Sequence, residues 1–154
     1  DETVVIKKMC RAAQSGGGGG GSSWPTVPYT GTGVGFPEAI QAAASNTTSN
    51  LAAANAVLTF RMPFAMTLSS VRASVSTAPT GSPIIVDVNQ NGSTVLSTKV
   101  TIDVTKETSL QSAVQPVVSN STLTDDAEIT IDIDQVGATI PGIGLMVTLI
   151  GRRA

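Results

Sequence analysis

AEITIDID, residues 127–134, is the stretch that decides the fold of this chain. Isoleucine stands at every second position, Ile129, Ile131 and Ile133, and the residues between them are Glu, Thr or Asp. A period of two is typical of a β-strand that buries one face and exposes the other to water. Residues 127–134 therefore predict an amphipathic strand.

Segments on both sides of this strand share its composition. They are rich in Val, Ile, Leu and Thr and are separated by turn formers, as in Asn91-Gly92, which predicts a tight hairpin. The expected strands are 38–45, 57–61, 66–75, 84–89, 94–104, 127–134 and 145–150. The first of them, 38–45, has enough alanine for a short helix, but its neighbours favour a strand.

Many short strands, antiparallel turn chemistry and no long helical period predict an all-β protein. We expect a single antiparallel β-sandwich of the jelly-roll type. The length of 154 residues suits one domain plus a tail. The expected division is an N-terminal extended arm at 1–15, a Gly- and Pro-rich linker and loop at 16–37, and the sandwich at 38–154.

The arm contains a short apolar run, Val4, Val5 and Ile6, and is followed by six glycines, Gly16 to Gly21. Glycine loses more backbone entropy on ordering than any other residue, so the run is expected to be tethered to the domain. Two interpretations stay open. The run is either a fraying terminus or an anchor strand that adds to the sheet of a partner.

Residues 24–37 combine prolines and glycines with three aromatic residues, Trp24, Tyr29 and Phe36. Proline favours extended backbone, so this segment is expected to run as a coil over a surface, pinned there by its aromatic rings. The alternative is that the three rings form a contact platform for a sugar or a protein.

Composition disfavours several classes of function. The chain has no histidine and a single cysteine, Cys10, which removes the usual catalytic dyads, so we expect no enzyme, no cofactor and no metal site. A net charge of −2 gives no basic field for nucleic acid. No apolar run is long enough to cross a bilayer and the N-terminus lacks a signal-peptide pattern, so we expect neither membrane insertion nor secretion.

Three motifs resemble binding sites. Asp87 to Gly92 matches the first half of a calcium loop, but Thr98 stands where the bidentate Glu belongs, so a hairpin is the better interpretation. Gly31 to Gly35 lacks the Lys-Ser or Lys-Thr of a phosphate loop. The acidic residues Asp125, Asp126, Glu128, Asp132 and Asp134 are expected in a turn and on a solvated strand face, with a cation site at a subunit contact as the alternative.

Only 13% of the residues are charged, whereas 41% are hydrophobic. The expected strands carry Thr, Ser, Asn and Gln on their outer faces, which lowers charge repulsion between copies. We therefore expect a homo-oligomer, with a trimer favoured.

Residues 56–151 resemble a small domain that recurs in virion structural proteins of tailed bacteriophages. The phrases that carry the resemblance are TFRMPFAMTLSSVRASVSTAPTGS at 59–82, VDVNQNGSTVLSTKVTID at 86–103, LTDDAEITIDIDQVG at 123–137 and GLMVTLIG at 144–151. The arm and the glycines lie outside this region. The resemblance implies structural or adhesive work without catalysis, on the exterior of the tail or the capsid.

Two positions in a virion suit an arm joined to a sandwich. One is a tail-fibre or baseplate-attached module that binds a host-surface glycan or receptor through loops 78–83 and 105–122. The other is a capsid decoration (cement) protein whose arm adds a strand to the shell. A third hypothesis, from a different class, is a carbohydrate-binding module. The tail-fibre interpretation is favoured slightly.

Overall fold

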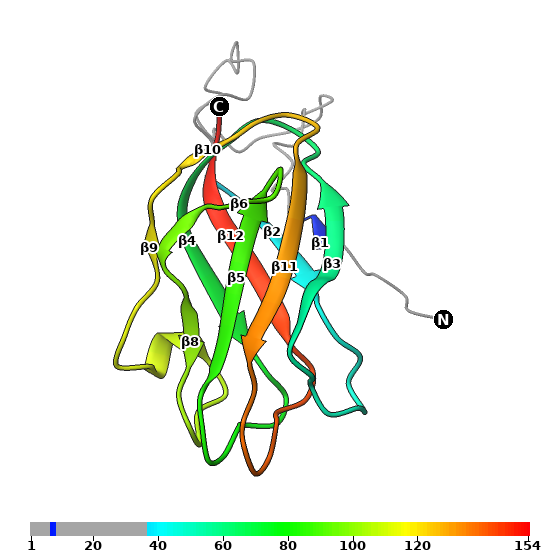
Figure 1. Ribbon diagram of the computed structural model, residues 1–154. Coiled ribbons are helices and arrows are strands. Elements are labelled where there is room, and N and C mark those ends of the chain that lie inside the picture. Colours follow the sequence, from blue (N-terminus) through cyan, green and yellow to red (C-terminus); the bar gives the residue numbers. More distant parts are fainter. Residues whose placement is uncertain (1–6, 9–36) are drawn as a thin grey trace, which may run out of the picture.

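The protein is described by a computed structural model over residues 7–8 and 37–154. Two antiparallel sheets pack face to face (Figure 1). The first has the order β1-β2-β12-β4-β10, and the second has the order β3-β11-β5-β6, with β8 also paired to β5. The strands are β1 (Lys7–Lys8), β2 (Pro37–Ala43), β3 (Ala54–Arg61), β4 (Met66–Ser74), β5 (Ile84–Gln90), β6 (Ser93–Thr94), β7 (Leu96–Thr98), β8 (Val100–Ile102), β9 (Val117–Val118), β10 (Thr122–Leu123), β11 (Glu128–Gln135) and β12 (Met146–Arg153); a 3-10 helix, η1, spans Ser109–Gln111. The predicted all-β sandwich is confirmed.

The longer strands alternate between the two sheets along the chain. β2, β4 and β12 belong to the first sheet, and β3, β5 and β11 belong to the second. The last two long strands, β11 and β12, each lie between two neighbours in their sheets (Figure 1). The sandwich therefore closes only when the C-terminal part of the chain is in place.

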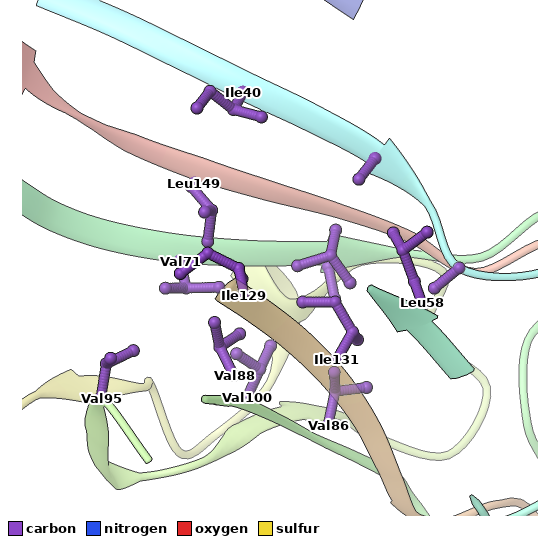
Figure 2. Close-up of a cluster of buried hydrophobic side chains, with 14 of the residues drawn as sticks. Ile40, Leu58, Val71, Val86, Val88, Val95, Val100, Ile129, Ile131 and Leu149 are labelled. Atoms are coloured by element: carbon purple, nitrogen blue, oxygen red, sulfur yellow. The ribbon is translucent and has the colours of Figure 1, made fainter. Parts of the chain in front are cut away.

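The core lies between the two sheets and follows the period of two. Ile129, Ile131 and Ile133 of β11 are all buried, as the sequence predicts. Figure 2 shows side chains of β5 and β11 facing Ile40, Val71 and Leu149 of the first sheet. Burial of each such side chain contributes about 1.5–3 kcal/mol relative to exposure, so the alternation holds the two layers together.

The predicted hairpin at Asn91-Gly92 is confirmed. Asn91 and Gly92 have φ angles of 49° and 81° and join β5 to β6. Positive φ at both central residues is the requirement of the type I′ turn, which Asn-Gly meets at low cost. The predicted first strand is confirmed as well, because 37–43 forms β2 in register with β12.

The single strand expected at 94–104 is wrong, because the chain forms β6, β7 and β8 there. Val95 and Leu96 are both buried, which breaks the alternation. The Thr94 hydroxyl accepts a hydrogen bond from Leu96 N at 3.1 Å, and the carbonyl of Val95 accepts one from Ser119 N at 2.9 Å. The chain thereby leaves β5, and β7 pairs with β9 instead.

Candidate functional site

Two surface features of the sandwich stand out, and the first is a cluster of acidic side chains around one lysine. Lys99 Nζ lies 3.1 Å from Asp87 Oδ2 and 2.7 Å from Asp134 Oδ2. Asp87 belongs to β5 and Asp134 to the adjacent β11, while Lys99 follows β7. The side chain of Asp87 is only 7% exposed, so its charge depends on protein partners.

The other oxygen of Asp87 is also bonded. Asp87 Oδ1 accepts hydrogen bonds from the Thr94 hydroxyl at 2.6 Å and from Val88 N at 2.8 Å. Buried carboxylates are stable when such donors replace water. Asp87 thus joins β5 to the segment that departs from it after β6.

Lys99 is fixed in its charged form by this arrangement. The hydrogen bonds to Asp134 and to Asp87 raise the pKa of Lys99 above its usual value of 10.5, against a smaller opposing effect of desolvation. An amine with a raised pKa stays protonated at neutral pH, so it has no free lone pair with which to act as a nucleophile or general base. The cluster is therefore suited to holding strands together.

Asp132 is engaged separately from this lysine. Its Oδ1 accepts a hydrogen bond from Ala56 N at 2.7 Å, and its Oδ2 accepts one from Asn89 Nδ2 at 2.9 Å. These bonds join β11 to β3 on one side and to β5 on the other. The outer face of the second sheet is thus cross-linked by polar side chains.

The predicted acidic group is not brought together as one site. Glu128 forms an ion pair with Arg61 at 3.3 Å, and Asp126 lies in a turn with φ of 57°. Among the described residues, no group of three or more acidic, histidine or cysteine side chains is placed to hold a metal ion. In the cluster around Asp87 and Asp134 the positive charge comes from Lys99.

The second feature is an exposed apolar segment at 104–117, which we call the apolar loop. Its exposed side chains include Leu110 and Val114, each at 54%, and Val117, at 51%. It contains η1, which lies beside β8 at one side of the sandwich (Figure 1). Single exposed aliphatic residues are common on proteins, but several in one short segment favour a contact surface.

Buried serines fix the apolar loop to the sandwich. Ser109 is 1% exposed, and its hydroxyl oxygen accepts a hydrogen bond from Ala73 N of β4 at 3.0 Å. The Ser112 hydroxyl donates to the carbonyl of Thr101 at 2.7 Å and accepts from Asp103 N at 2.9 Å. The exposed side chains are therefore presented by a well-anchored backbone.

The side-chain amide of Gln115 also stabilises the apolar loop. Gln115 Nε2 donates to the carbonyls of Ser109 and Ser112, at 2.9 and 2.8 Å. The sequence predicted 105–122 as a contact loop but did not reveal these anchors, because serine and glutamine in a loop usually face water. The loop therefore combines an apolar surface with a fixed shape.

The other predicted contact loop, 78–83, is held by the segment before β12. Thr80 N donates to the carbonyl of Ile140, and Thr139 N donates to the carbonyl of Thr80, each at 3.0 Å. Ile140 is a further exposed large hydrophobic residue, at 41%. This loop is also part of the folded domain.

Several predicted site residues lie outside the described part of the chain: Val4, Val5, Ile6, Trp24, Tyr29 and Phe36, and with them the glycine motif at 31–35. The structure does describe Lys7 and Lys8, which form β1 and pair with β2 of the same sheet. Within residues 7–8 and 37–154, no helix has the length and apolar character to span a bilayer.

No protein-family model, curated protein or solved structure matches this chain. The resemblance to phage virion domains therefore stays a prediction from the sequence.

Proposed function

We propose that this protein is a non-enzymatic structural component of a phage virion, a tail-fibre or baseplate-attached module that contributes to attachment at the host surface. The observation that carries the proposal is the apolar loop. It presents Leu110, Val114 and Val117 on a backbone that buried Ser109 and Ser112 hold in place.

The physical reason lies in the entropy of binding. Association is weakened when the contact residues must first become ordered, and a pre-organised loop avoids most of that loss. Aliphatic side chains without aromatic rings among them suit a protein partner better than a sugar, which stacks on aromatic faces. The favoured partner is accordingly another virion protein or a protein at the host surface.

The resemblance of residues 56–151 to phage virion domains supports the same proposal. The sparsely charged surface is compatible with close packing against neighbouring subunits. Capsid decoration is the second candidate, and the pairing of β1 with β2 favours it, since it places a strand from the arm at a sheet edge.

Localisation on particles tests the proposal. Gold-labelled antibodies against this protein, or cryo-electron microscopy of the particle, would show density on the tail or its fibres if the first candidate is correct. Density on the shell would overturn the tail placement in favour of decoration. Absence of the protein from particles would overturn both virion candidates.

Substitution in the apolar loop tests the contact surface itself. Leu110→Asp and Val114→Asp, both at exposed positions, are expected to weaken binding to the partner by roughly fivefold or more, since a residue central to an interface contributes more than 1 kcal/mol. Ser93→Asp in the β5–β6 hairpin is the matched control and should leave binding unchanged. Equal binding by all three variants would exclude the apolar loop as the contact.

A further inference from the structure

The free side of β2 can accept a strand. β2 pairs with β12 without a register shift from Pro37, opposite Arg152, to Ala43, opposite Met146. On its other side, within the described part of the chain, only Gln41 and Ile40 are paired, with Lys7 and Lys8 of β1. A straight edge strand with unpaired backbone groups is a template for strand addition.

The other long edge strand, β3, is protected against such addition. Its pairing with β11 shifts register between Ile131 and Ile133, and Ala56 in this region has φ of 50°. The amide of Ala56 is taken by Asp132 Oδ1. Bulges of this kind discourage pairing with a further chain, and β2 has none.

The length of the connection between β1 and β2 allows the β1 that pairs with a given β2 to come from the same molecule or from another one. Residues 9–36 join Lys8 to Pro37, yet Lys8 pairs with Ile40, which stands roughly 10 Å along the strand from Pro37. Continuing the pairing from Ile40 to Pro37 and closing it with a two-residue turn would need only about five residues. The connection has 28 residues, 9–36, and a chain of that length can span up to about 90 Å when extended, which is enough to reach a neighbouring molecule.

We propose that β1 is exchanged between copies of this chain, so that β1 of one molecule adds to β2 of another. The backbone hydrogen bonds are the same whichever molecule supplies β1, and in a closed oligomer every β2 receives one strand. The sequence before β1, Val4-Val5-Ile6, has the β-branched composition that strands favour. This inference does not depend on the proposed role in a virion.

The protein concentration decides whether β1 pairs with β2 of its own chain or with β2 of another copy. The tether gives β1 of the same chain an effective concentration on the order of 1 mM at its own β2. Exchange therefore becomes comparable with internal pairing when the protein itself is near 1 mM. Below that concentration internal pairing prevails.

Disulfide trapping tests the exchange. In the full chain with Cys10→Ser, one preparation carries Lys7→Cys and a second, labelled with ¹⁵N, carries Gln41→Cys; Lys7 and Gln41 are paired across β1 and β2. Directly opposed residues in antiparallel strands have Cα separations that a disulfide can bridge. The two preparations are unfolded, mixed, refolded together at about 1 mM and oxidised. Mass spectrometry then quantifies mixed dimers, which are disulfide-linked dimers of one unlabelled and one ¹⁵N-labelled chain.

The matched control replaces Gln41→Cys with Thr59→Cys, an exposed position on β3. Exchange predicts at least about fivefold more mixed dimer with Gln41→Cys than with Thr59→Cys, and a decline on dilution to micromolar protein. Circular dichroism checks that each variant folds. Among the described residues, the Gln41 side chain makes one hydrogen bond that Gln41→Cys removes, to Thr148 at 3.4 Å.

A chain that carries both Lys7→Cys and Gln41→Cys defines the opposite result. The proposal is overturned if mixed dimers are no more frequent than with the Thr59→Cys control and the double variant forms an intramolecular disulfide as a monomer. Those two results together would show that β1 pairs only with β2 of its own chain. If the double variant forms neither an intramolecular nor an intermolecular disulfide, the proposal is overturned as well, because β1 then does not lie at β2.

Discussion

Lys99 stabilises the second sheet as a counter-ion, because it bridges the nearly buried Asp87 and the adjacent Asp134. Lys99→Met leaves Asp87 without a cation, and we expect a loss of about 1–2 kcal/mol in the free energy of unfolding at neutral pH. Lys99→Arg, the control, should lose less. Urea denaturation of the three proteins measures the differences.

The pH dependence of this contribution has a definite sign. The pKa of Lys99 is raised in the folded state by its hydrogen bonds to Asp134 and Asp87, so its stabilisation is complete below the unfolded value of 10.5 and is lost as pH rises through the folded value. The stability difference between the wild type and Lys99→Met should therefore shrink above pH 10.5. A difference that stays constant up to about pH 12 would contradict the ion-pair explanation.

Ala56 is a residue with local backbone strain. Its φ of 50° lies in the left-handed region, which costs a residue with a Cβ atom roughly 1–2 kcal/mol. Ala56→Gly should raise the free energy of unfolding by about 0.5–1 kcal/mol, since glycine relieves the strain but loses more entropy on folding. Ala54→Gly, on the same strand without positive φ, should lower it. Thermal unfolding that shows equal losses for both would refute this account.

Among the elements, η1 is joined to β4 by one hydroxyl. Ser109 accepts from Ala73 N inside the protein, so Ser109→Ala leaves a buried amide without a partner and should cost about 1–3 kcal/mol. Leu110→Ala, a neighbour on η1 that is 54% exposed, should change stability little. Urea denaturation compares the two, and a similar effect of both would mean that Ser109 does not anchor η1.

The elements also show where reasoning from sequence succeeds. β11 and β12 were predictable because each buries one face, so the core imposes the period of two on their residues. The division of 94–104 into three strands was not, because it depends on Val95 turning inward and pairing with Ser119, a contact distant in sequence. Alternating composition gives no signal for such a switch of partners.

The candidate site shows the same limit. The apolar loop, 104–117, overlaps the contact loop predicted at 105–122, but its rigidity arises from Ser109 and Ser112, whose burial depends on β4 and β8. Likewise the acidic residues were recognised, whereas Lys99 as their counter-ion was not, since it joins them only through the fold. Tertiary contacts of single polar residues leave no periodic trace in sequence.

At the scale of the whole molecule, the buried hydrophobic core of the described chain runs from Ile40 to Leu149. A chain of residues 37–154 should therefore fold without the arm and linker. Its free energy of unfolding should fall by no more than about 2 kcal/mol, because the short β1–β2 pairing involves few backbone hydrogen bonds, each worth about 1 kcal/mol. Urea denaturation followed by far-ultraviolet circular dichroism measures this, and an unfolded product would show that residues 1–36 belong to the core.

The same truncation separates two sources of association. If strand exchange holds copies together, sedimentation equilibrium near 1 mM should show oligomers for the full chain and monomers for residues 37–154. If association rests instead on the apolar loop and the sparsely charged surface, the truncated chain should associate as strongly as the full chain, and Leu110→Asp should abolish it. A full chain that stays monomeric at this concentration would contradict both the expected homo-oligomer and the exchange of β1, because each requires contact between copies when the protein is crowded.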